Sequence, residues 1–193
     1  MQNTDGAQWK SYLMAGVLAV SAAMNGLLIL KVKHEEKVIL NVKQQNRLQV
    51  GQEVPNITGK TVDGKPIEVN FAASPKPTIL YVFSPACAWC KRNFENMTAL
   101  HRGVEDQYGF VGISLTDKDL PEYVKVHGID YPVVTGLPEI TKTVYRLGGT
   151  PATIVVSPQK KVLKAWTGAY NAPLQAEISS YFNVKLPGLP KQN

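Results

Sequence analysis

The chain contains only two cysteines, Cys87 and Cys90, and they are separated by two residues. They can therefore form an intramolecular disulfide only with each other. The mostly apolar run 78–83 precedes them and is typical of a strand buried on both faces of a sheet. Helical spacing of apolar residues begins at Cys90. A buried strand, a CxxC motif and a helix in this order predict an α/β fold with a candidate thiol–disulfide exchange site.

The remaining patterns extend this fold on both sides of the cysteines. Asp63-Gly64 stands between two short extended runs and predicts a hairpin before the first buried strand. Apolar runs and helical spacing predict further strands at 109–115, 130–135, 152–156 and 162–166, and helices at 90–107, 119–127, 138–147 and 173–182. We expect a mixed central sheet flanked by helices over residues 50–183. The tail 184–193 contains two prolines and is expected to be loose.

An uncharged run of 20 residues, Ser11–Leu30, precedes this domain. Its length matches the hydrocarbon core of a bilayer, which takes about 20 helical residues. We expect residues 1–30 to form a membrane anchor with a single transmembrane helix, and residues 31–49 to form a polar stalk. A cleavable signal peptide is the alternative, because Ser21-Ala22-Ala23 resembles a cleavage site. Residues 1–9 carry no Lys or Arg, which argues against that alternative.

The charge around this run conflicts with the expected orientation. Lys10 is the only basic residue before it, whereas Lys31, Lys33 and Lys37 follow closely. The positive-inside rule alone would keep the C-terminal domain in the cytoplasm, but the rule weakens for long translocated domains. The redox function that the cysteine pair indicates points to the outside and outweighs the charge pattern, so we expect the domain outside the cytoplasm.

Composition and histidine placement exclude several other functions. The net charge of +6 could attract an anionic partner. However, no basic stripe with interleaved aromatic residues is present, so we expect no nucleic-acid partner. One CxxC with the scattered His34, His101 and His127 is a poor zinc set. Haem attachment requires a histidine where Lys91 stands. We therefore expect neither a metal nor a cofactor.

The two cysteines are expected to differ in chemistry. Cys87 should lie at the N-terminus of a helix, where unpaired N–H groups and the helix dipole favour the thiolate. Cys90, one turn further, should be more shielded. We therefore predict that Cys87 is the attacking nucleophile and Cys90 the resolving thiol. Trp89 between them either offers a flat apolar surface to a partner or packs on the domain.

Thr150-Pro151 directly precedes the predicted strand 152–156. A proline here cannot donate to a strand ladder. A cis bond would direct the backbone of Thr150 towards an incoming extended peptide and place the Pro151 ring beside the cysteines. The alternative is an ordinary trans proline that opens the strand. Thr150 and Pro151 are thus candidate substrate-binding residues.

These motifs together resemble the thioredoxin superfamily, and more narrowly its membrane-anchored TlpA/ResA-like thiol–disulfide oxidoreductases. The resemblance covers 50–182 and rests on Gly51-Gln52-Glu53-Val54-Pro55, Asp63-Gly64-Lys65, Cys87-Ala88-Trp89-Cys90 and Gly149-Thr150-Pro151. It implies a thioredoxin-like fold, the cysteine roles above and a cis Pro151. It also implies client proteins with disulfides or thiols, in cytochrome c maturation or another dedicated pathway, and re-reduction by a membrane thiol donor. The implied location is a bacterial inner or cytoplasmic membrane, with the domain in the periplasm or outside.

Several positions depart from the family pattern. Trp usually precedes the first cysteine and Pro the second, but Ala86 and Trp89 stand there. Tyr81 and Asn93 occupy the positions of the two usual proton-handling carboxylates. How Cys90 is deprotonated is left open, and Glu95 is only a weak candidate.

Two other functions remain as alternatives. The domain could be a redox-inactive binding module that docks a partner around Trp89 and Pro151. A disulfide that closes so short a loop contributes little stability, which argues against a purely structural pair. A peroxiredoxin-like thiol peroxidase is the second alternative, because the opening motif is similar. Its Pro–Thr–Cys signature is absent, since Leu80 and Ser84 replace the proline and the threonine.

Overall fold

The computed structural model describes residues 14, 16, 21, 24–37 and 47–190. The chain divides into two units, Met1–Arg47 and Leu48–Asn193. In the first unit, residues 24–37 are helical. Among the described residues, none of the helices has both the length and the apolar character that crossing a bilayer requires. About half of the predicted span Ser11–Leu30 and about half of the stalk 31–49 lie outside the described residues, and both stay predictions.

A five-stranded mixed sheet forms the centre of the second unit. Its strand order is β5-β4-β3-β6-β7, with bounds β3 (Thr78–Phe83), β4 (Gly109–Ser114), β5 (Val133–Val134), β6 (Ala152–Val156) and β7 (Val162–Thr167). The first three are parallel, and β6 and β7 are each antiparallel to their neighbour. All six residues of β3 are buried, as its continuous apolar run predicts. The strand that leads to the cysteines is therefore the middle strand.

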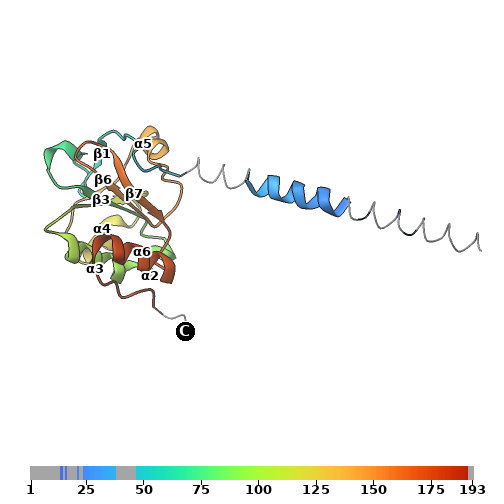
Figure 1. Cartoon of the computed structure of the whole chain (residues 1–193). Helices are drawn as coiled ribbons and strands as arrows, with labels where there is room; N and C mark the ends of the chain where they lie inside the picture. Colours follow the sequence, from blue (N-terminus) through green and yellow to red (C-terminus); the bar gives the residue numbers. More distant parts are fainter. Residues whose placement is uncertain (1–13, 15, 17–20, 22–23, 38–46, 191–193) are drawn as a thin grey trace, which may run out of the picture. The chain divides into compact units, whose positions relative to one another are not determined.

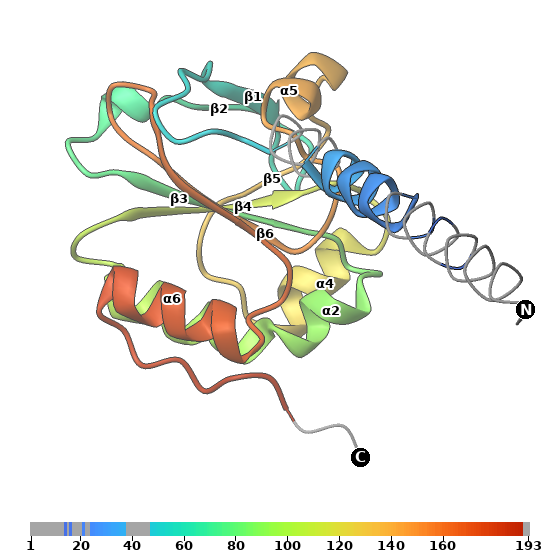
Figure 2. The same cartoon turned by 45° about the vertical axis from the view of Figure 1, so that its right-hand side comes forward.

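Helices cover both faces of this sheet (Figures 1 and 2). One face carries α2 (Ala88–Arg92), α3 (Phe94–Val104), α4 (Leu120–Val126) and α6 (Ala172–Phe182). The other face carries α5 (Glu139–Val144), the hairpin β1 (Ile57–Lys60)–β2 (Pro66–Val69) and a 3-10 turn, η1 (Phe71–Ala73). The predicted α/β fold with a mixed sheet and an N-terminal hairpin is confirmed.

Two apolar clusters, one on each face, hold these layers together. On the first face, Met97 and Leu100 of α3 pack with Ile178 of α6 against β3. On the other, Phe71 and Tyr145 close over the sheet. Each fully buried large apolar side chain contributes roughly 1.5–3 kcal/mol, so both faces contribute to fixing β3 and the segment after it.

The hairpin approaches β5 so closely that only glycine fits at position 59. Lys60 N donates to Thr135 O and Thr135 N donates to Lys60 O, both at 2.8 Å. A Cβ added at Gly59 would lie 2.5 Å from Thr135 O and 2.6 Å from Cγ1 of Val134. The hairpin would have to move away from the sheet edge to accept it.

We therefore expect Gly59→Ala to lower the free energy of unfolding by about 1–3 kcal/mol, the usual cost of overpacking. Urea denaturation followed by circular dichroism measures this change. Gly148→Ala is the matched control, because a Cβ there meets nothing within 4 Å. A Gly59→Ala protein as stable as the control would show that the hairpin does not pack as described.

The structure differs from the expectation of a loose tail over residues 184–190. Leu186 is buried, and its carbonyl oxygen accepts a hydrogen bond of 2.7 Å from Gln175 Nε2. Gly188 N donates to Oδ1 of the buried Asn96 at 2.8 Å. The prolines prevent a regular helix or strand here, but they do not prevent docking, because single apolar and polar groups fasten the segment to α3 and α6.

Candidate active site

Cys87 is the N-cap residue of α2. Its backbone is extended, with φ −76° and ψ 113°, and its Sγ accepts a hydrogen bond of 3.2 Å from Cys90 N. The sulfur thus fills the acceptor position that a Ser or Asp side chain usually takes at a helix start. The buried strand β3 ends at Phe83, so the short turn 84–86 delivers Cys87 to the end of the central strand. The predicted placement of Cys87 is confirmed.

Several groups act on the protonation of Cys87. Partial burial by itself would raise the pKa of the Cys87 thiol. The thiol of Cys90, the side chain of Thr150 and the backbone N–H groups of Cys90 and Trp89 oppose it, and the net pKa is lowered. The thiolate, which is the nucleophilic form, is therefore favoured at this cysteine.

Cys90 has the opposite environment. It is only 1% exposed. Burial, followed by its hydrogen bond with the Cys87 side chain, raises the pKa of Cys90 to about 12. Both cysteines are free thiols in this structure. Cys87 is thus a partly exposed thiol with a lowered pKa and Cys90 a buried thiol with a raised pKa, in the order the sequence predicts.

This asymmetry predicts the pH dependence of alkylation. Because its pKa is lowered, Cys87 should react with iodoacetamide with a midpoint below that of an unperturbed cysteine. Cys90 should stay unmodified at neutral pH. Mass spectrometry of the reduced protein, quenched at intervals from pH 5 to 10, measures both rates. Equal alkylation of the two cysteines, or a Cys87 midpoint above that of a free cysteine, would contradict the assignment.

Thr150 and Pro151 lie beside the cysteines. The Thr150–Pro151 peptide bond is cis, as the family resemblance implies. The Cys87 thiol donates to Thr150 O at 3.6 Å, and Pro151 O accepts a hydrogen bond of 2.8 Å from Gly168 N. Residues 63 positions apart in the sequence therefore meet at one site.

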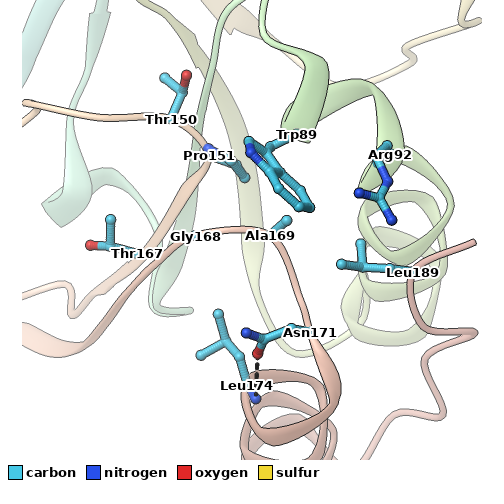
Figure 3. A pocket seen from close by; sticks show the side chains of 10 residues that line it. All are labelled: Trp89, Arg92, Thr150, Pro151, Thr167, Gly168, Ala169, Asn171, Leu174 and Leu189. Carbon is cyan, nitrogen blue, oxygen red and sulfur yellow. Dashed lines mark hydrogen bonds between the residues drawn. The ribbon is translucent and has the colours of Figure 1, made fainter. Parts of the chain in front are cut away.

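Trp89 projects from the first turn of α2 and is 50% exposed. The guanidinium carbon of Arg92 lies 4.6 Å from the centre of its ring, which is a cation–π contact. Figure 3 shows this ring beside Pro151 at the edge of a pocket. The pocket has a volume of about 360 Å³ and is lined by Trp89, Arg92, Thr150, Pro151, Thr167, Gly168, Ala169, Asn171, Leu174 and Leu189. Trp89 therefore borders a cavity next to the cysteines instead of packing fully on the domain.

A buried polar network lies behind the cysteines. Asn93 is 0% exposed, and its Nδ2 donates to Tyr81 OH at 3.3 Å. Its Oδ1 accepts from Asn96 Nδ2 at 3.1 Å and from Tyr170 N at 2.9 Å. Asn93 also separates α2 from α3, whereas the sequence predicted one continuous helix. The apolar spacing runs through this position, so it gave no sign of the break.

The two positions that usually hold carboxylates in the family are thus occupied by the neutral side chains of Tyr81 and Asn93. Burial raises the pKa of Tyr81 well above its usual value, and the nearby Cys90 adds to this. Glu95 is exposed on the surface of α3 and is not among the hydrogen-bonded partners of Asn93. From the sequence, Tyr81 and Asn93 could be recognised only as departures from the family pattern. Their hydrogen bond to each other depends on a contact between the strand β3 and the end of α2, which the sequence does not indicate.

The described part of the chain offers no group of three or more His, Cys, Asp or Glu side chains placed to hold a metal ion.

Comparison with known proteins decides the family. The sequence model of the AhpC/TSA family matches residues 50–165, which include both cysteines and the Thr150–Pro151 pair. The chain belongs to the AhpC/TSA family. Thiol-disulfide oxidoreductase ResA of Bacillus subtilis (strain 168) is 25% identical over 141 residues, covering 72% of this chain and 76% of that protein.

Solved structures share the fold of this AhpC/TSA member. A putative thiol:disulfide interchange protein DsbE from Chlorobium tepidum superposes with a TM-score of 0.60 at 16% identity, covering 70% of this chain and 97% of that one. The thioredoxin domain of a thiol-disulfide oxidoreductase from Bacteroides vulgatus has a TM-score of 0.58 at 19% identity, with coverages of 70% and 99%. The predicted resemblance to ResA-like proteins of the thioredoxin superfamily is confirmed, and the chain falls in the predicted enzyme class, thiol–disulfide oxidoreductases.

Proposed function

We propose that this protein reduces disulfide bonds in client proteins with the Cys87–Cys90 pair. The observation that carries the proposal is the position of Cys87 Sγ, which is 3.2 Å from Cys90 N and 3.6 Å from Thr150 O. The Cys87 thiolate attacks one sulfur of a client disulfide, and the other client sulfur leaves as a thiolate that takes up a proton. Cys90 then loses its proton and attacks Cys87 Sγ. The mixed disulfide breaks, and the client leaves with both of its sulfurs as thiols. The protein has passed two electrons to the client and now holds a Cys87–Cys90 disulfide.

The reduction potential of the couple tests the direction of electron flow. The full chain is equilibrated with mixtures of reduced and oxidised dithiothreitol, and the free thiols are counted after alkylation. We expect a potential near or below that of thioredoxin, roughly −270 mV, which suits a reductant that a membrane thiol donor recharges. A potential near roughly −120 mV, that of a strong oxidant, would overturn the proposed direction.

Turnover separates this function from the two alternatives. A disulfide reductase should consume a reductant continuously when a disulfide peptide is supplied. A redox-inactive binding module would bind the peptide without turnover. A thiol peroxidase would instead turn over with hydrogen peroxide, and we expect this rate to be low because Leu80 and Ser84 stand in place of the peroxidatic Pro and Thr.

Anchoring to a bacterial membrane, with the domain outside the cytoplasm, is part of the proposal. The described helix 24–37 supports it, because large apolar side chains are exposed along its first half: Met24, Leu27, Leu28, Ile29 and Leu30. A helix that exposes such a surface gains free energy by burying it in lipid. Protease added to intact spheroplasts should degrade the domain if it faces outwards. Protection until the membrane is lysed would place it in the cytoplasm.

The proposed clients are apocytochromes c or another dedicated set of disulfide-containing proteins. Cells that lack the protein should then accumulate oxidised clients, and an added chemical reductant should return these clients to the reduced state. Normal levels of covalently bound haem in such cells would exclude cytochrome c maturation while leaving disulfide reduction in place.

A further inference from the structure

The C-terminal segment, residues 186–190, is fastened beside the redox helix α2. Gly188 N donates to the buried Asn96 Oδ1 at 2.8 Å, and Arg92 Nη2 donates to Pro190 O at 3.2 Å. These two bonds lie on either side of Leu189 in the sequence. The same Arg92 stacks on Trp89, with 4.6 Å between the guanidinium carbon and the ring centre. The position of Leu189 is thus fixed by α3 and by α2, which begins directly after Cys87 and contains Cys90.

Leu189 lines the pocket that Trp89 and Pro151 also border. In Figure 3 it lies on the Arg92 side of the pocket, opposite Thr167, with Leu174 below. Residues from α2, the loop before β6, the loop after β7, α6 and the C-terminal segment therefore enclose one cavity. The C-terminal segment forms one wall of this pocket, which the sheet and the helices alone would leave open.

The lining of this pocket favours one kind of occupant. Trp89, Pro151, Leu174 and Leu189 present apolar surface, and none of the lining residues is acidic. Arg92 is the only charged lining residue, so a Lys or Arg side chain would meet a like charge and no acidic partner. A cavity of about 360 Å³ has room for a large apolar side chain.

We propose that the C-terminal segment is a specificity element, and that the pocket it completes binds a large apolar side chain adjacent to the reacting cysteine of a client. The inference rests on the proposed function, because the client cysteine must reach Cys87 Sγ, 3.6 Å from Thr150 O. The chain on one side of that cysteine then runs past Pro151, and its apolar side chain enters between Trp89 and Leu189. Preferred clients carry Phe, Leu or Met beside the cysteine.

The test uses the full-length reduced protein and two cyclic disulfide peptides that differ only in the residue next to one cysteine, Phe or Ala. We expect wild type to favour the Phe peptide by about 10-fold or more in kcat/KM, as filling an apolar pocket usually provides. Leu189→Ala should reduce this ratio towards 1. Leu189→Asp should additionally raise the relative rate with a third peptide that carries Lys at that place. Lys185→Ala, an exposed change in the same tail, should keep the wild-type ratio.

The outcomes separate the two proposals. Equal kcat/KM for the Phe and Ala peptides in wild type would overturn the pocket's specificity while disulfide reduction stands. A full Phe preference in Leu189→Ala would overturn the role of the C-terminal segment. Reduction of none of the peptides by wild type would overturn both proposals. Circular dichroism of each variant shows that a changed ratio is not a loss of fold, and the ratio itself is independent of the fraction of active protein.

Discussion

Replacing Cys90 with serine is expected to abolish steady-state disulfide reduction and to trap clients on Cys87. Cys87 keeps its place at the N-terminus of α2 and can still attack, but no neighbouring thiol can then release the client. The loss should be on the order of 10²-fold or more, because a positioned intramolecular group has an effective concentration far above that of any free thiol. Non-reducing gels of cells that express Cys90→Ser should show mixed disulfides, and mass spectrometry identifies the clients.

Cys87→Ser is the matched control for this experiment. It removes the nucleophile and leaves Cys90, which is 1% exposed and has its pKa raised to about 12, so it should trap nothing. Trapping by Cys87→Ser and not by Cys90→Ser would reverse the roles of the two thiols. Absence of trapping by both variants, with active wild type, would contradict the mixed-disulfide route.

The largest expected loss of stability comes from Asn93→Ala. The Asn93 amide makes three hydrogen bonds inside the protein, to Tyr81 OH, Asn96 Nδ2 and Tyr170 N. Its removal leaves the buried N–H of Tyr170 and the amide of Asn96 without this acceptor, and each unsatisfied buried group costs about 1–3 kcal/mol. We expect the free energy of unfolding to fall by about 3 kcal/mol in urea denaturation.

Glu95→Ala, two residues away and exposed, is the matched control and should change stability by less than about 0.5 kcal/mol. Tyr81→Phe separates one bond from the rest. It removes only the hydroxyl that accepts from Asn93 Nδ2, so its effect should be smaller than that of Asn93→Ala. An Asn93→Ala protein as stable as the control would mean that water replaces the network.

The sequence predicted those parts of the fold in which local patterns and tertiary packing agree. The apolar run of β3 is buried on both faces, and Asp63-Gly64 turns between β1 and β2, where Gly64 has φ +83°. The site was predicted because CxxC fixes the spacing of Cys87 and Cys90, and the family resemblance connects Pro151 to them. In each case the informative residues are neighbours in the sequence or share a motif.

The parts that the sequence did not predict depend on single contacts over long separations. Gly188 and Asn96 are 92 residues apart, and neither residue type indicates a partner. Asn93 lies within an uninterrupted helical spacing, yet its amide faces the core and the helix divides there. Leu189 reads as one apolar residue in a proline-containing tail, and only the docked position of that tail makes it part of a pocket.

The neutral network behind Cys90 has an electrochemical consequence. None of Tyr81, Asn93, Asn96 and Tyr170 is a carboxyl group, and burial raises the pKa of both tyrosines. Within this network no group gains or loses a proton with the redox state near neutral pH, so the thiols set the proton stoichiometry. Below the pKa of Cys87 two protons accompany two electrons, and between the two thiol pKa values only one does. The potential of the couple should then fall by about 59 mV per pH unit in the first range and about 30 mV in the second, with a single bend at the pKa of Cys87.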